Sequence, residues 1–438
     1  MVGSSLDAHR ESPGHPSYDL VVVGGGSAGL TAAIMAGRLG ARTLLVDRER
    51  LGGDCTHHGC VPSKALIHCA RLAHHIEGSS RFGIEASSRV DWSGVKAHIQ
   101  RAIDRVAAHE TPEALAAHGI EVAFGGARFA DGPSQLVVGG ERVVTARRVV
   151  LCVGSRSAPP PIPGLAEAGF IDHRDVFRLD ALPKRLAVIG GGPIGVELGQ
   201  ALARLGVKVT IVQRGPRILP RDDDELTNML ADRLRAELDV VTDAEVLSCE
   251  RDGDDHVVRW ERDGQSQLLR CDAILVATGR VANVEGLELE RAGVALRDGR
   301  IAVDPYVRTS ARGVYAAGDC AGPHAFTHFA SAQARIATRN ALFRFPQRFQ
   351  PAAVPWCTFT DPELAQVGMT EAQATQSGED IRIYRRDYQH VDRAVSEAST
   401  GASPRRSAGA MDACWAPRSW APRRVRPSCR SSRQSRKG

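Results

Sequence analysis

Two cysteines, Cys55 and Cys60, are separated by four residues in the segment 52–64, GGDCTHHGCVPSK. A close thiol pair can form and break a disulfide, which takes up or releases two electrons as one unit. If a helix begins near Cys60, its positive N-terminal end favours the thiolate form of that residue. Two alternatives stay open: a structural disulfide, or a zinc site completed by His57 and His58, although four tetrahedral ligands at this spacing would be unusual. The pattern favours a redox pair, and we expect no metal.

An internal repeat predicts the elements that position this pair. Residues 18–47 and 184–213 each contain a short apolar strand, a glycine turn, an amphipathic helix ending at Leu-Gly, and a second apolar strand. The turn glycines of the two copies stand at a constant offset of 166: Gly24, Gly26 and Gly29 in the first, and Gly190, Gly192 and Gly195 in the second. Two complete copies in this context indicate two dinucleotide-binding βαβ units. The N-terminus of each helix then offers N–H groups to a pyrophosphate.

The residues that end the two units predict different ligands. The first unit ends at Asp47, whose carboxylate can accept both hydroxyls of an adenosine ribose. The second has Gln213 at the same offset, followed by Arg214 and Arg217. An acid there would repel a 2′-phosphate, whereas arginines would pair with it. This pattern favours NADPH over NADH, unless both arginines are solvated loop residues.

Four segments resemble the flavoprotein disulfide reductases, a family that includes dihydrolipoyl dehydrogenase, glutathione reductase and mercuric reductase. They are the cysteine segment 52–64, GGGPIGVE at 190–197, ATGR at 277–280 and AAGDC at 316–320. The resemblance covers about residues 18–397, and the cysteine segment is its most specific motif. It implies that the first unit binds FAD and the second a nicotinamide dinucleotide.

The resemblance also implies a role for individual residues. Cys60 should be the thiolate that faces the flavin, and Cys55 the thiol that exchanges with substrate. Lys64 should lie near the flavin N5, paired with Glu197, although both could instead be unrelated surface charges. Asp319 should hydrogen-bond the FAD ribitol, although it could merely cap a turn. The expected FAD residues are Gly24, Gly26, Gly29, Asp47, Gly53, Gly154, Gly318 and Asp319. The expected NAD(P) residues are Gly190, Gly192, Gly195, Gln213, Arg214, Arg217 and Gly279.

The implied order of electron transfer runs from NAD(P)H to flavin, then to the disulfide, and then from the dithiol to substrate. The runs 326–340 and 354–368 look most similar to mercuric-reductase-like proteins, with dihydrolipoyl dehydrogenase as the near alternative. The expected substrate is therefore Hg(II) or a small organic disulfide. Two further functions stay open: a flavoprotein that passes electrons to quinones, dyes or oxygen without its thiols, and a non-catalytic dinucleotide-binding remnant.

The predicted fold is α/β, with two Rossmann-like domains of the three-layer ββα type. The FAD-binding domain is placed at 18–157 and 285–345, the NAD(P)-binding domain at 158–284, and an incomplete α+β dimerisation domain at 346–397. Residues 1–17 and 398–438 are predicted to be disordered. The first seventeen residues contain no apolar signal-peptide segment, and no apolar run approaches the roughly 20 residues that span a bilayer. We therefore expect a cytoplasmic protein without a membrane partner.

The C-terminal residues differ in composition from the rest. Residues 399–438 hold ten Lys or Arg and one acid, which leaves a net charge of −4 for residues 1–398 and no support for nucleic-acid binding there. This segment contains no Leu, Ile or Phe and cannot bury a core. By resemblance, relatives continue instead with a β-rich region that forms the dimer interface and carries a His–Glu pair. We expect that this chain cannot dimerise normally, that its activity is impaired, and that a frameshift lies near 396–400; a natural basic tail is the alternative.

Overall fold

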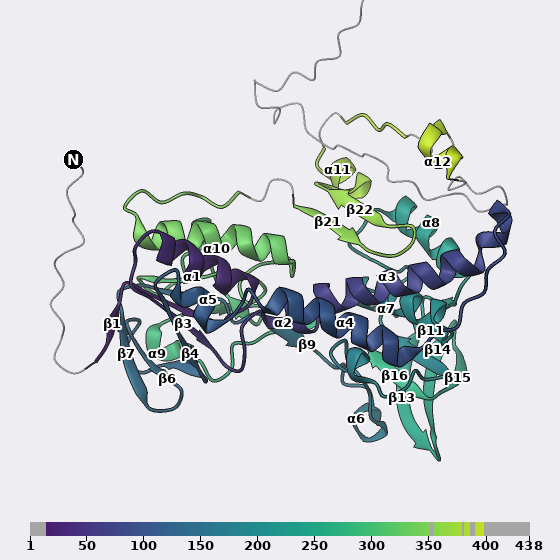
Figure 1. Ribbon diagram of the computed structural model, residues 1–438, viewed down its shortest axis with the longest axis horizontal. Coiled ribbons are helices and arrows are strands. Elements are labelled where there is room, and N and C mark those ends of the chain that lie inside the picture. The colour runs from purple at the N-terminus through teal and green to yellow at the C-terminus, as the bar shows by residue number, and fades with distance from the viewer. Residues whose placement is uncertain (1–14, 351–353, 379–380, 386–389, 398–438) are drawn as a thin grey trace, which may run out of the picture.

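The computed structural model describes residues 15–350, 354–378, 381–385 and 390–397. Figure 1 shows two α/β lobes with the short strand β9 between them. The left lobe is built on a five-stranded parallel sheet in the order β20-β8-β2-β3-β4. Its strands are β2 (Leu20–Val23), β3 (Thr43–Asp47), β4 (Ile120–Phe124), β8 (Val149–Leu151) and β20 (Val314–Ala316). A second sheet in this lobe has the order β1-β7-β6-β5, formed by β1 (Ser17–Tyr18), β5 (Ala127–Phe129), β6 (Gln135–Val138) and β7 (Arg142–Ala146).

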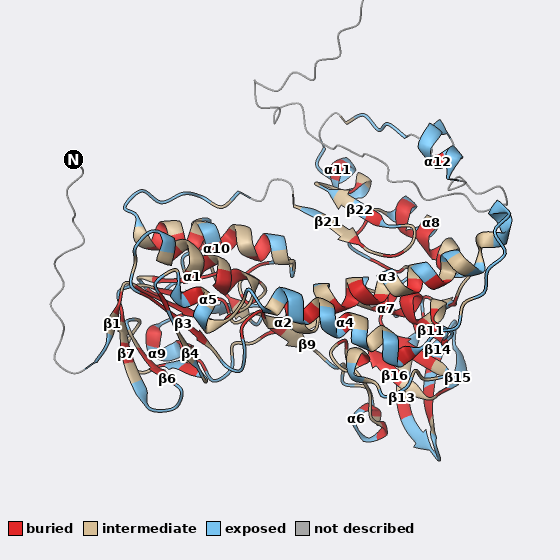
Figure 2. Ribbon diagram, in the orientation of Figure 1, coloured by how far each residue is buried: buried red, intermediate tan, exposed pale blue. Residues whose placement is uncertain are grey.

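Alternating side chains of the parallel strands hold three layers together. Val22 points to one face, into a buried cluster with Ala32 of helix α1 (Ser27–Arg38) and Ala337 of helix α10 (Thr327–Leu342). Val21 points to the other face, into a cluster with Phe129 of the second sheet. Successive residues of a strand face opposite sides, so a fully apolar strand buries both faces. The buried strands of Figure 2 follow this pattern.

The right lobe repeats the arrangement. Its parallel sheet has the order β12-β11-β10-β16, with β10 (Arg185–Ile189), β11 (Lys208–Val212), β12 (Asp239–Val241) and β16 (Ala273–Val276). Helices α7 (Pro193–Arg204) and α8 (Asp224–Leu234) contribute to the cluster on one face of this sheet. The antiparallel strands β13 (Glu245–Asp252), β14 (Asp255–Arg262) and β15 (Gln265–Cys271) cover the other face. The predicted pair of three-layer α/β domains is confirmed.

Four helices lie in the sequence between β3 and β4, which are neighbouring strands of the first parallel sheet. They are α2 (Gly53–His57), α3 (Cys60–Glu77), α4 (Trp92–Ala107) and α5 (Pro112–Ala116). The amphipathic region 93–118 is not one continuous helix. The chain stops being helical after Ala107 and starts again at Pro112, where the side chain of Thr111 accepts a hydrogen bond from the Ala114 amide. Proline is well suited to the first turn of a helix and poorly suited to its interior.

The chain crosses between the lobes on a two-stranded ribbon. Strand β9 (Ser155–Ser157) leads out of the first lobe, and β17 (Arg280–Ala282) leads back, paired with it antiparallel. The predicted domain boundaries at 157/158 and 284/285 lie beside this ribbon and stay predictions. Strand β1 begins at Ser17, one residue before the predicted start of the first domain. The predictions for residues 1–14 and 398–438 fall outside the described residues.

The remaining elements are short. Those before residue 350 are the 3-10 helices η1 (Ser79–Phe82) and η2 (Val176–Arg178), the helices α6 (Leu165–Ala168) and α9 (Leu289–Ala292), and the hairpin of β18 (Leu296–Arg297) and β19 (Arg300–Ile301). Those after it are β21 (Pro355–Thr358), β22 (Leu364–Val367), α11 (Glu371–Gln376) and α12 (Asp392–Ser396). Of the helices in the described part of the chain, none has the length and apolar character of a membrane span.

The glycines of the first turn predict a clear difference between two substitutions. A Cβ on Gly29 would lie 1.7 Å from the carbonyl oxygen of Gly24, whereas a Cβ on Gly26 would have only Gly53 Cα nearby, at 3.8 Å. We expect Gly29→Ala to destabilise the apoprotein by about 1–3 kcal/mol, the usual cost of overpacking. Gly26→Ala should leave the apoprotein melting temperature unchanged and weaken FAD binding. Thermal denaturation and FAD titration measure both; equal melting temperatures for the two variants would contradict the assignment.

Candidate active site

A cavity of about 1380 Å³ opens between the two lobes and the strand β21. This exceeds the roughly 300–1,000 Å³ of an ordinary ligand pocket. The expected residues that line it are Gly24, Gly26, Asp47, Gly53, Cys55, Cys60, Lys64, Gly154, Glu197, Gly318 and Asp319. The cavity therefore brings the expected FAD residues and the thiol pair together. Gly29 does not line it and serves the contact between helix α1 and strand β2 instead.

One end of the cavity has the form of a pyrophosphate cradle. Gly24 has φ +106°, and a Cβ there would lie 2.3 Å from the carbonyl oxygen of Cys152. Gly53 has φ +60°, and a Cβ there would lie 2.7 Å from Cα of Gly26, the N-cap of helix α1. Only bare backbone fits at these positions, with helix N–H groups facing the space. Asp47 lies beside this turn, where its Oδ2 accepts a hydrogen bond of 2.6 Å from the Gly25 amide. These residues fit FAD.

The thiol pair lies at the junction of two helices. Cys55 is on α2, and Cys60 is the first residue of α3, where the sequence predicts a helix start. The hydrogen bond from Cys55 lowers the pKa of the Cys60 thiol to about 6 against the opposing effect of burial, assisted by Thr327 and by the charge of Lys64. The same thiol–thiol hydrogen bond, followed by burial, raises the pKa of Cys55 well above its usual range. Reduction of the pair should therefore leave the negative charge on Cys60.

Lys64 and Glu197 form an ion pair beside the thiols. Lys64 lies on α3 one turn after Cys60, and its Nζ donates to Oε2 of Glu197 at 2.9 Å. Glu197 is 7% exposed, and its Oε1 accepts from the amide of Phe359 at 2.9 Å. The Lys64 ammonium also lies 4.3 Å from the centre of the Phe359 ring. These three contacts hold a cation at a fixed place in the cavity wall.

The two histidines of the cysteine segment have other partners. His57 Nε2 lies 2.7 Å from the carbonyl oxygen of Leu51, and His58 Nε2 lies 2.8 Å from Nη2 of Arg50. Among the residues that the structure describes, no group of His, Cys, Asp and Glu has the arrangement of a metal site. The geometry does not favour the zinc alternative.

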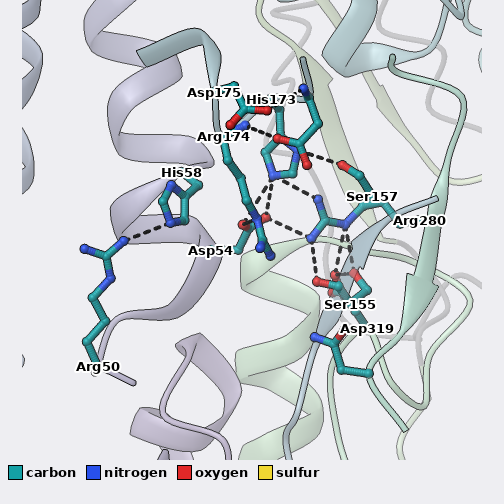
Figure 3. A network of polar contacts seen from close by, with 12 residues as sticks. Arg50, Asp54, His58, Ser155, Ser157, His173, Arg174, Asp175, Arg280 and Asp319 are labelled. Atoms are coloured by element: carbon teal, nitrogen blue, oxygen red, sulfur yellow. Dashed lines mark hydrogen bonds and ion pairs between the residues drawn. The ribbon is translucent and has the colours of Figure 1, made fainter. Parts of the chain in front are cut away.

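A polar network beside the thiols is the main feature that sequence reasoning missed (Figure 3). Asp54 precedes Cys55 and accepts hydrogen bonds from His173 Nε2 at 3.0 Å and Arg280 Nη2 at 2.8 Å. Burial raises the pKa of the Asp54 carboxyl, but the hydrogen bond from His173 and the charges of Arg280 and Arg174 outweigh it and hold the pKa well below its usual range. Asp54 and Arg280 stand in the segments 52–64 and 277–280, so their types were visible. No signal in the sequence pointed to His173.

The second glycine turn has the same geometry as the first. Gly190 has φ +111°, and a Cβ on Gly195 would lie 2.1 Å from the carbonyl oxygen of Gly190. Gln213 Oε1 accepts from the Gly191 amide at 2.8 Å, in the way that Asp47 accepts from Gly25. The expected NAD(P) residues do not line the cavity that holds the thiols: Gly190, Gly192, Gly195, Gln213, Arg214, Arg217 and Gly279.

The two arginines after Gln213 differ in their environment. Arg214 is exposed. Arg217 pairs with Asp224 at 2.7 Å and donates to the carbonyl oxygens of Asp222 and Pro220. Arg214 is therefore the freer of the two to meet a ligand.

A family comparison agrees with this geometry. The model of the pyridine nucleotide-disulphide oxidoreductases matches residues 18–341, and the model of their dimerisation domain matches residues 354–403. The chain belongs to the pyridine nucleotide-disulphide oxidoreductase family. Members of this family use FAD, with NADH or NADPH as electron donor. The resemblance stated from the cysteine segment is confirmed.

Individual relatives carry several activities. The chain is 32% identical to a mercuric reductase of Bacillus cereus over 90% of this chain, but spans only 63% of that protein. It is 37% identical to a dihydrolipoyl dehydrogenase of Pseudomonas aeruginosa, over 87% of this chain and 83% of the relative. Among solved structures, the HOCl-induced flavoprotein disulfide reductase RclA of Escherichia coli is similar, with a TM-score of 0.77, 29% identity, and coverage of 87% and 84%.

The acidity of Cys60 predicts a pH profile. The thiolate forms as the pH rises through the pKa of about 6, so alkylation of the reduced protein by iodoacetamide should accelerate with an apparent pKa near 6. Because Lys64 lowers this pKa, Lys64→Met should move the profile to higher pH. Lys208→Met is the matched control, since Lys208 is exposed at the start of β11, away from the thiols. A profile that stays at the pKa of an ordinary thiol would refute the assignment.

Proposed function

We propose that this protein is an FAD-dependent NAD(P)H oxidoreductase that passes electrons through the Cys55–Cys60 pair to a soft acceptor. The observation that carries the proposal is the unequal acidity of the two thiols in a cavity that also holds the FAD-type cradle. An acidic Cys60 and a protonated Cys55 suit a pair in which one sulfur stays with the cofactor and the other exchanges with substrate.

Each residue would have a distinct task. Bound FAD would supply the two-electron carrier between the nicotinamide and the disulfide. Lys64, held by Glu197, provides a fixed positive charge that stabilises negative charge on Cys60. Cys55, as a thiol, exchanges with a disulfide substrate: the dithiol returns to a disulfide and the substrate leaves as two thiols. With Hg(II) as substrate, the same two electrons would give elemental mercury.

For the substrate we propose Hg(II), with a dihydrolipoyl-dehydrogenase-like disulfide reaction as the second candidate. Similarity to mercuric reductases and the preference of thiolates for soft metal ions support the first. The higher identity to the Pseudomonas aeruginosa dihydrolipoyl dehydrogenase supports the second. NADPH oxidation with Hg(II) in excess thiol, compared with NADH oxidation by lipoamide, separates them. The predictions of impaired activity and dimerisation, and of a cytoplasmic location, stay predictions.

Serine variants of the two cysteines test the thiol pathway. Cys55→Ser cannot form the disulfide, so Cys60 should remain a thiolate, and the FAD-loaded variant should show a long-wavelength charge-transfer band without any reductant above pH 7. Cys60→Ser should lack this band even after anaerobic reduction. Both variants should lose most turnover with disulfides or Hg(II). Full activity in both would instead identify a flavoprotein that reduces quinones or oxygen without its thiols.

Arg214 tests the proposed preference for NADPH. If it pairs with the 2′-phosphate, Arg214→Ala should raise KM for NADPH about tenfold, as loss of a charged contact of roughly 1.4 kcal/mol predicts, and leave KM for NADH unchanged. Arg217→Ala provides the comparison, because Arg217 is already paired within its own loop. Steady-state kinetics with both nucleotides measures the effect. An equal change for NADH and NADPH would remove the preference from the proposal.

A further inference from the structure

The ribbon of β9 and β17 is a weak connection for two large lobes. Each strand has three residues, and the pair has no other strand in its sheet. An isolated two-stranded ribbon is marginally stable in water and does not fix an angle between the bodies it joins. The apolar packing of α3 against α7 holds the second lobe on one side, and polar contacts must complete its placement beside the thiols.

The Asp54 network supplies such contacts from the thiol side. Asp54 is in the first turn of α2, directly before Cys55. Two donors converge on its carboxylate, His173 Nε2 at 3.0 Å and Arg280 Nη2 at 2.8 Å. The Arg174 guanidinium adds an ion pair, with its Nε 3.4 Å from Oδ1 of Asp54. Figure 3 shows His173 and Arg280 both directed toward Asp54. All three residues stand in or beside the part of the chain between the two crossings of the ribbon.

The same network continues into the ribbon and on to the cavity wall. Arg280 is the first residue of β17, and its Nε donates to Ser155 Oγ of β9 at 2.8 Å. The hydroxyl of Ser155 donates to Oδ2 of Asp319 at 2.6 Å. His173, which is 4% exposed, contacts the Ser157 hydroxyl of β9 through Nδ1 at 3.0 Å. Helix α2, which carries Cys55 and is called the redox helix below, is therefore connected to both strands of the ribbon and to Asp319 by one chain of contacts.

The charges of the network balance only when every member is present. Two carboxylates, Asp54 and Asp319, face two guanidiniums, Arg174 and Arg280. These groups are half-buried, and loss of the Asp54 charge leaves two cations without their shared partner. The contacts around the ribbon should then rearrange.

We propose that Asp54, His173 and Arg280 are positioning residues that set the orientation of the nucleotide-binding lobe over the redox helix. The inference rests on the proposed function and adds a group of residues for the nicotinamide step. Hydride transfer needs reacting atoms about 3–3.5 Å apart, so a small rotation of this lobe slows it strongly. The thiol exchange at Cys55 requires no nicotinamide and is independent of that orientation.

The test separates the two half-reactions in FAD-loaded protein. Asp54→Asn keeps the shape of the side chain and removes its charge. Stopped-flow reduction of the flavin by saturating NADPH should slow at least about tenfold. Dithionite-reduced protein should react with the small disulfide dithiodipyridine at the wild-type rate. Glu285→Gln is the matched control, because it removes a carboxylate that pairs with Arg156 of β9 at the surface, and both of its rates should be unchanged.

Two further measurements do not depend on turnover. Hydrogen exchange of the amides in 155–157 and 280–282 should be faster in Asp54→Asn than in Glu285→Gln. His173→Gln keeps a donor toward Asp54 and should give a smaller change in the same direction. The double variant Asp54→Asn with Arg280→Gln should be no slower in flavin reduction than the slower single variant, because both break one network.

The outcomes are distinct. An unchanged rate of flavin reduction in Asp54→Asn, or an equal loss in both half-reactions, would overturn the positioning role. A wild-type protein that takes up FAD but does not reduce dithiodipyridine would instead defeat the proposed function.

Discussion

The packing of helix α3 against helix α7 is the contact on which the site depends. Leu66 and Ala70 of α3, contributed by the first half of the chain, are buried in one cluster with Val196 and Leu202 of α7 from the second lobe. This apolar contact places two polar residues opposite each other in the adjoining turns: Lys64 on α3 and Glu197 on α7. Without it, each would be a costly isolated charge in the wall of a cavity.

The glycine turns of the two lobes make the same hydrogen bond with two different side chains. In both, a side chain at or directly after the end of the second strand accepts a hydrogen bond from the middle residue of the glycine turn. Asp47 accepts from Gly25, and Gln213 accepts from Gly191. The Asp47 carboxylate and the Gln213 amide therefore hold their turns in the same way. The difference in charge between the two side chains can still select the ligand, since a carboxylate repels a 2′-phosphate and an amide does not.

Electrostatics around the thiols is asymmetric although the two sulfurs are neighbours. Cys60 has the helix start, Thr327 and Lys64 on its side. Cys55 donates its hydrogen bond to Cys60, and this bond together with burial raises the pKa of the Cys55 thiol. The two sulfurs therefore differ in acidity, and the negative charge of the reduced pair is favoured on Cys60.

The sequence by itself determined the local features of this protein. Glycine spacing, strands apolar on both faces, and a thiol pair before a helix specify two three-layer dinucleotide folds and a redox segment, because each depends on the conformation of a few consecutive residues. The boundary at Pro112 was also visible in principle, since proline favours a helix start.

Only the tertiary structure decided which charges meet. Asp54 lies 119 positions from His173 and 226 from Arg280, and Lys64 lies 133 from Glu197. The last pair was expected only through the family resemblance, and the first two were not expected at all. Such contacts form only when segments far apart in the chain pack together, which no local pattern encodes.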